Sequence, residues 1–325
     1  MRLKLVPNDT KVDFFSFSKI SLGLSSVLII GTLIAFFTMG LNFGIDFRGG
    51  TMIMVETPEE VAVGEYRDLL SGVVDGDVTV TELSDPAAAL TGEANHVIMV
   101  RIEQVGDDAA VQNDLIKIVK DTLSEGFEGI VFLQTDSVGA KVSGELIQAG
   151  VLAIVLAVGA VLFYIWLRFE WQFSVGAVVA LVHDVFITIG IFCVTQIEFN
   201  LTIIAAILTI VGYSLNDTVV VFDRVRENLR RYKTMGLKDV LNLSINETLS
   251  RTIMTSVTTL IALLTLYFLG GDVIRGFTFA MIWGIVIGTY SSIFVASVIL
   301  LRLGVKRDWD KTDNAAGTQF ADVDA

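Results

Sequence analysis

The hydrophobic and polar positions of this chain separate into long apolar runs and one polar stretch. A run of about 20 apolar residues is long enough to cross the hydrocarbon layer of a bilayer as a helix. Without a proline in any run, a kink has to come from glycine or polar residues. The pattern predicts six transmembrane helices in a one-plus-five arrangement, at residues 19–40 and then at about 146–167, 173–194, 201–222, 252–269 and 274–301.

The polar stretch, residues 41–142, lies between the first and second predicted spans and shows the periods of strands and helices. The order of these elements is βαββαβ, which is typical of a ferredoxin-like α+β domain. The second helix is predicted to bury Val111, Leu115, Ile118 and Leu123 on one face. We expect strands at 51–56, 77–83, 96–105 and 130–134, and helices at 59–71 and 107–123.

The composition supports an integral membrane protein with one acidic domain. Hydrophobic residues make up 53% of the chain, and the net charge is -13. Residues 41–145 contain 20 acidic and 6 basic residues, so the polar domain carries nearly all of this charge. An acidic domain without a basic patch argues against nucleic-acid binding. The single Cys193 excludes a disulfide or a thiol pair for a metal, and no cofactor, metal cluster or enzyme nucleophile is indicated.

Basic residues indicate the orientation. They gather in residues 1–18, around Arg168, in the segment 223–251 between two spans, and in the tail 304–325. Because Lys and Arg in short loops favour the cytoplasmic side, we expect both termini in the cytoplasm and residues 41–142 in the periplasm. The tail is expected to be disordered.

Asp217, inside the fourth span, is the leading candidate for function. A charged aspartate near a helix centre in a membrane costs roughly 2.5–3.5 kcal/mol and usually faces a bundle interior or a water path, with a partner. Arg251, at the start of the fifth span, is a candidate counter-charge, or only a positive-inside anchor. Asn216, Tyr213 and Thr255 offer polar groups nearby. The pair predicts a proton pathway; the alternative is a neutral structural aspartate with one interhelical hydrogen bond.

His183 and Asp184 form a second polar pair, in the third span. Such groups either relay protons or lock helices together by hydrogen bonds, and the sequence leaves both interpretations open.

Small residues follow the last span at four-residue spacing. Such a ridge lets helix backbones approach closely in a membrane, and it is also compatible with a sliding surface. The leading members are Gly276, Ala280, Gly284 and Gly288.

Four segments together resemble the SecF members of the SecD/SecF family of protein-export membrane proteins, in the RND superfamily. They are Gly-Ile-Asp-Phe-Arg-Gly-Gly-Thr at 44–51, Leu-Val-His-Asp-Val at 181–185, the stretch from Val211 to Arg224, and Leu-Ser-Arg-Thr followed by Thr-Ser at 249–256. The first contains the family signature Asp46, Phe47, Gly49 and Gly50, to which we assign no chemistry.

The resemblance implies half of a twelve-helix bundle, completed by SecD as a separate polypeptide. It also implies association with the SecYEG channel, with YajC and YidC as further partners, and use of the proton-motive force to promote preprotein translocation across the bacterial inner membrane. In that family the membrane aspartate and the arginine of the next span carry protons, which corresponds to Asp217 and Arg251 here. The alternatives are half of another RND-type exporter and a passive membrane scaffold or insertion factor.

Overall fold

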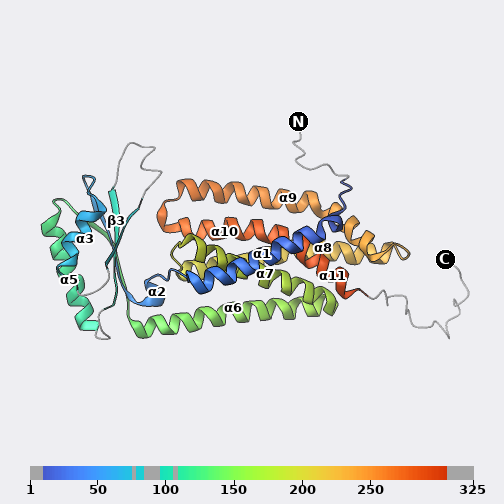
Figure 1. The fold of residues 1–325 in the computed structure, drawn as a ribbon, viewed down its shortest axis with the longest axis horizontal. Coiled ribbons are helices and arrows are strands. Elements are labelled where there is room, and N and C mark those ends of the chain that lie inside the picture. The colour runs from blue at the N-terminus through green and yellow to red at the C-terminus, as the bar shows by residue number, and fades with distance from the viewer. Residues whose placement is uncertain (1–9, 75–77, 84–95, 105–108, 306–325) are drawn as a thin grey trace, which may run out of the picture.

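The computed structural model describes residues 10–74, 78–83, 96–104 and 109–305. Six helical segments are long and apolar enough to cross a membrane. The chain between the first and the second segment forms a small α+β domain at one end of the bundle (Figure 1). This confirms the predicted one-plus-five arrangement. Most of the predicted tail, from residue 306 on, lies outside the described residues.

The spans are longer than the apolar runs that predicted them. They are α1 (Ser18–Thr38) with a 3-10 turn at Phe14–Phe17 before it, α6 (Ala140–Arg168), α7 (Trp171–Thr195), α8 (Leu201–Arg231), α9 (Leu237–Leu269), and a last span made of α10 (Asp272–Ser291), a π-helical turn at Ser292–Ala296 and α11 (Ser297–Leu303).

The segment 223–251, expected as the connection between two spans, is mostly helical. Hydropathy falls at Asp223, but α8 continues to Arg231 and α9 already begins at Leu237. Arg and Glu are good helix formers, and Arg230 and Arg231 in the last turn complement the helix dipole. Hydropathy marks where a helix leaves the membrane, not where it ends.

The outer domain has the predicted βαββαβ order, with a four-stranded antiparallel sheet in the spatial order β2-β3-β1-β4. This confirms the ferredoxin-like arrangement. Its elements are β1 (Gly50–Thr57), α3 (Val63–Ser71), β2 (Val78–Leu83), β3 (His96–Ile102), α5 (Ala109–Gly126) and β4 (Val131–Val138).

Both outer-domain helices cover the sheet face that points away from the membrane spans (Figure 1). Residues Ile53 and Val55 of β1 are fully buried in the core there. The predicted apolar face of α5 is partly wrong, because Val111 and Ile118 are exposed. Val119 takes the core position instead, one turn before Leu123.

The membrane spans form an interior and a periphery. About half or more of the apolar windows of α7, α8 and the last span is buried, whereas α1, α6 and α9 keep most of theirs exposed. In a bilayer these outward apolar faces contact lipid or another membrane chain.

The small residues of α10 face α8. A Cβ atom at Gly284 would lie 2.4 Å from the side chain of Ile210, and one at Gly288 would lie 3.1 Å from Ser214 Cβ. Gly276 similarly faces Ile203, and Ala280 is fully buried. The ridge therefore sets the close approach of α10 to the helix that carries Asp217.

We predict that Gly284→Ala lowers the thermal midpoint of the purified protein in detergent, because overpacking against Ile210 costs about 1–3 kcal/mol. Gly159→Ala on α6 is the matched control, since a Cβ there meets no atom within 4 Å. Equal midpoints for the two variants would contradict close packing at this crossing.

Candidate functional site

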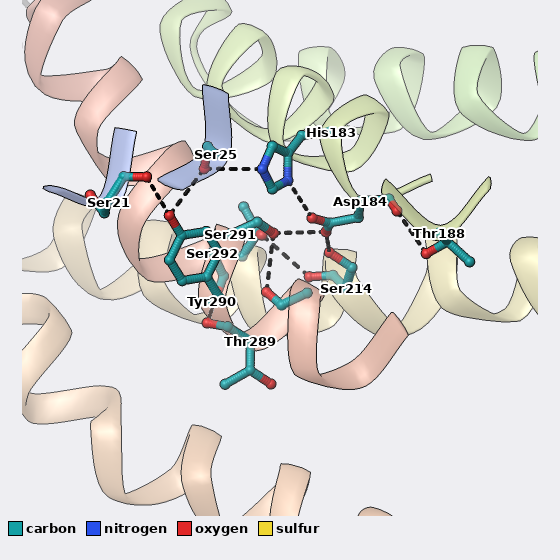
Figure 2. Close-up of polar contacts among 12 residues, drawn as sticks. Ser21, Ser25, His183, Asp184, Thr188, Ser214, Thr289, Tyr290, Ser291 and Ser292 are labelled. Carbon is teal, nitrogen blue, oxygen red and sulfur yellow. Dashed lines mark hydrogen bonds and ion pairs between the residues drawn. The ribbon is translucent and has the colours of Figure 1, made fainter. Parts of the chain in front are cut away.

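A buried network of polar side chains surrounds Asp184 in the middle of the bundle (Figure 2). The residue is 1% exposed. Ser214 on α8 donates to its Oδ2 at 2.6 Å, and Ser291 at the end of α10 donates to the same oxygen at 2.7 Å. His183 Nδ1 lies 3.0 Å from Oδ1. Both carboxyl oxygens of Asp184 are therefore engaged, by three different helices.

The network continues from His183 to the first span. His183 Nε2 lies 3.1 Å from Ser25 Oγ on α1, and Ser25 Oγ lies 3.0 Å from the Tyr290 hydroxyl of α10. Tyr290 in turn donates to the backbone carbonyl of Ser21 at 2.6 Å (Figure 2). We call these seven residues the Asp184 network; it joins α1, α7, α8 and α10.

Asp217 has a different environment. It is 4% exposed, yet its Oδ2 is buried with no hydrogen-bond partner in the described part of the chain. Arg251, exposed on α9, is close enough for its charge to act on this carboxyl group, but no ion pair joins the two among the described residues. A buried acceptor without a donor is costly, so this oxygen is open to a proton or a water molecule.

The packing of α8 against α9 places Arg251 within range of Asp217. The Tyr213 hydroxyl donates to Thr259 Oγ1 at 3.4 Å, which fixes the register of the two antiparallel helices. From this contact Asp217 lies about 6 Å further along α8, and Arg251 about 12 Å in the same direction along α9, at 1.5 Å per residue. The axial offset between the two residues is therefore about 6 Å, consistent with the effect of the Arg251 charge on Asp217.

The other predicted polar groups contribute less. Thr255 Oγ1 donates to the backbone carbonyl of Arg251 at 2.9 Å, so this hydroxyl serves its own helix. Asn216 is exposed. Thr252, next to Arg251 on the same helix, is 2% exposed and its hydroxyl has no partner in the described structure.

The signature residues form the junction between the outer domain and the spans. Asp46 lies in α2 (Ile45–Arg48), and its Oδ2 accepts from the backbone N–H of Leu201, the first residue of α8, at 2.9 Å. Phe47 packs against Phe199, with ring centroids 6.0 Å apart. Gly49 and Gly50 then adopt φ values of 78° and 120°, which only glycine adopts readily, and turn the chain into β1.

Backbone hydrogen bonds tie this junction to the connection between α7 and α8. The Gly44 N–H donates to the Phe199 carbonyl at 2.9 Å, and the Phe199 N–H donates to the Asn42 carbonyl at 2.7 Å. The start of α8 and the chain entering the outer domain are therefore one hydrogen-bonded unit.

An ion pair adds a second connection. Arg101 of β3 pairs with Glu198 of the same α7–α8 connection. Burial raises the pKa of the Glu198 carboxyl; Arg101 opposes this rise and Asp46 adds to it. A cleft of about 640 Å³ separates the rest of the sheet from the bundle here, lined in part by Met52, Met54 and Met99.

Known protein families match this combination of six spans, outer domain and glycine-rich junction. A family model described as protein export membrane protein SecD/SecF, C-terminal, matches residues 118–306, and the SecD/SecF GG motif matches residues 34–57. The chain belongs to the SecD/SecF family. The GG motif is the junction described above, so the family's own signature is the part that attaches the outer domain to the spans.

Relatives place the chain in the SecF branch of this family. It is 53% identical to the protein translocase subunit SecF of Cereibacter sphaeroides over 324 residues, covering 100% of this chain and 99% of the relative. The SecF of Rhodobacter capsulatus is 50% identical, with 96% and 95% covered. The protein translocase subunit SecDF of Brucella abortus is 41% identical, with 96% of this chain but 40% of the relative covered.

Solved SecDF structures share the fold. The crystal structure of SecDF, a translocon-associated membrane protein, from Thermus thermophilus matches with a TM-score of 0.80 at 32% identity. SecDF in the super-membrane-facing form matches with a TM-score of 0.67 at 33% identity. Each match covers 93% of this chain and 40% of the SecDF chain, so this SecF-type chain corresponds to under half of those structures.

Sequence reasoning found both buried acids and the His183 neighbour of Asp184, but it missed other side chains around them. Single serines in an apolar run give no signal of their own, so Ser25 and Ser291 were not singled out. The Arg101–Glu198 pair was also missed, because its members lie 97 positions apart, on a strand and in a loop. Among the described residues no group of His, Cys, Asp or Glu is arranged to hold a metal ion.

We predict that contact between the outer domain and the bundle depends on pH through Glu198. Burial raises the pKa of the Glu198 carboxyl in this docked arrangement, although the Arg101 charge opposes the rise. Undocking that exposes Glu198 therefore releases a proton, so the contact is favoured at low pH and weakens as the pH rises through the raised pKa. Spin labels on α3 and in the α9–α10 turn, measured in lipid between pH 5 and 8, should show a broader distance distribution at high pH.

Glu198→Gln mimics the protonated side chain and should give the narrow distribution at every pH. Glu125→Gln, at an exposed position of α5, is the matched control and should respond as the unchanged protein does. A Glu198→Gln protein that keeps the full pH response would exclude Glu198 as its source.

Proposed function

We propose that this chain is the SecF subunit of a SecD–SecF complex that uses the proton-motive force to promote preprotein translocation and release at the SecYEG channel. The observation that carries the proposal is the open, buried Oδ2 of Asp217 within range of the Arg251 charge. A site of this kind has room for one proton, which changes its charge. Its location in an inner membrane, with the outer domain in the periplasm, rests on the basic residues of the short connections and on the family.

Proton binding at Asp217 removes the negative charge that attracts Arg251. The attraction between α8 and α9 then falls, and the helices can shift at the close α8–α10 crossing formed by Gly284 and Gly288. Because α8 begins at the hydrogen-bonded junction with Asp46, movement of α8 changes the position of the outer domain. SecD supplies the other half of the bundle in this proposal and covers exposed faces of the peripheral spans.

The Asp184 network supports this assignment by contrast. A carboxyl group whose two oxygens both have hydrogen-bond partners is less open to a further proton or water molecule than one with an unpartnered oxygen. Asp217 has such an oxygen. We therefore assign the exchange of protons first to Asp217.

We predict that Asp217→Asn abolishes the proton-dependent part of preprotein translocation while leaving the complex with SecD intact, because Asn keeps the volume and cannot ionise. The measurement is translocation into membrane vesicles with and without a proton gradient, together with co-purification of SecD. Asp239→Asn, at an exposed position in the first turn of α9, is the control and should translocate normally.

In the same assay Arg251→Lys should impair translocation less than Arg251→Met, since lysine keeps the charge but changes its reach. Gradient-dependent translocation that persists in Asp217→Asn would favour a passive scaffold over a proton-coupled subunit. Equal effects of the two Arg251 variants would reduce that residue to a membrane anchor.

A further inference from the structure

The Asp184 network contains a chain of four hydrogen bonds. The donor of the last one is fixed, and this decides which atom donates in the two bonds before it. It runs from Asp184 Oδ1 through His183 and Ser25 to Tyr290 and the Ser21 carbonyl (Figure 2). A carbonyl oxygen only accepts, so the Tyr290 hydroxyl must donate its one proton to Ser21. The Ser25–Tyr290 and His183–Ser25 contacts then each have one possible direction.

The directions determine where protons must be. Tyr290, having donated its proton, accepts from Ser25. Ser25, having donated its proton, must accept from His183, so His183 Nε2 carries a proton. One further proton lies between His183 Nδ1 and Asp184 Oδ1, because two bare acceptors would repel at 3.0 Å. The arrangement is complete only when the His183–Asp184 pair holds both protons.

We propose that the His183–Asp184 pair is a second proton-binding site of this chain, and that the structure shows it with its proton bound. When the pair loses one proton, the remaining proton stays on Nδ1 beside the carboxylate and Nε2 becomes an acceptor. Ser25 then turns to donate to Nε2, and Tyr290 has to give up its contact with Ser25 or with Ser21. Loss of the proton on α7 therefore weakens the attachment of α10 to α1.

The side chains around the His183–Asp184 pair come from three other helices. Helix α1 contributes Ser21 and Ser25, α8 contributes Ser214, and α10 contributes Tyr290 and Ser291, so within the described structure Tyr290 is the only other titratable group of the network. Asp217 follows Ser214 by three residues on α8, less than one helical turn away. Ser214, which bonds Asp184, and Asp217 therefore lie within one turn of α8. A role of the His183–Asp184 pair in transport rests on the proposed function.

The test observes His183 directly, without any transport. The chain contains two histidines, so His96→Gln leaves His183 as the single one. The full chain, carrying this change and labelled with 15N-histidine, is placed in lipid bilayers and its ring nitrogens are followed by solid-state NMR from pH 5 to 9. We expect Nε2 to carry a proton at low pH and to become a bare acceptor at high pH.

A variant tests whether the network controls this step. In Tyr290→Phe the Ser25 hydroxyl no longer has Tyr290 as an acceptor and is free to donate to Nε2. The protonated pair then no longer has the more complete set of hydrogen bonds, so the pH at which Nε2 loses its proton should fall. The expected change is roughly 3- to 10-fold in proton concentration, which is the size of one net hydrogen bond. Tyr164→Phe on the exposed surface of α6 is the control and should not move it.

An Nε2 that is bare at low pH, or that never changes while the protein stays folded, would overturn the proposal, as would a Tyr290→Phe transition that coincides with the control. These outcomes concern His183 alone. Failure of the proposed function is measured separately, as retained gradient-dependent translocation in Asp217→Asn.

Discussion

The structure depends on one constraint: inside a membrane, a polar side chain must find its hydrogen-bond partner within the protein. Asp184 meets it fully, with donors from α8 and α10 and a histidine neighbour that extends to α1. The network thereby holds together the interior helices and the first span, although α1 packs with most of its surface outward. Asp217 departs from the constraint, and a departure at the centre of a membrane domain points to function.

The connection to the outer domain is mechanical rather than chemical. Asp46 caps the first N–H of α8, and the backbone of residues 42–44 pairs with Phe199 just before that helix. A shift of α8 cannot leave these bonds unchanged, because each of them ends on a backbone group of Phe199 or Leu201 at the start of that helix. This explains why the glycine-rich junction is a family signature although its residues carry no acid–base chemistry: Gly50 has a φ of 120° and its missing Cβ leaves room for the Ile102 carbonyl of β3.

The sequence predicted the elements because their signals are long and periodic. Six apolar runs and an alternating polar stretch suffice for the spans and the βαββαβ domain, and Asp217 and Asp184 stand out because charge is rare in such runs. The contents of the sites could not be predicted in the same way. A serine costs little in an apolar helix wherever it points, so only the structure shows that Ser25 and Ser291 converge on one histidine–aspartate pair. The predicted buried face of α5 was partly wrong because the pattern allows two overlapping apolar stripes. Packing against the sheet buries the stripe that contains Val119.

The energy that one proton can supply is similar in size to the cost of breaking one hydrogen bond in the bundle, which is what the proposed coupling between the two sites requires. Moving one elementary charge through 100 mV is worth about 2.3 kcal/mol, and leaving one buried polar group without its partner costs about 1–3 kcal/mol. A single proton therefore suffices to exchange one hydrogen-bond arrangement for another, but not to unfold the bundle. Ser214 bonds Asp184 and lies three residues before Asp217, so both carboxyl groups act on the same turn of α8. That turn packs closely against Gly288, so a shift of α8 also changes its contact with α10.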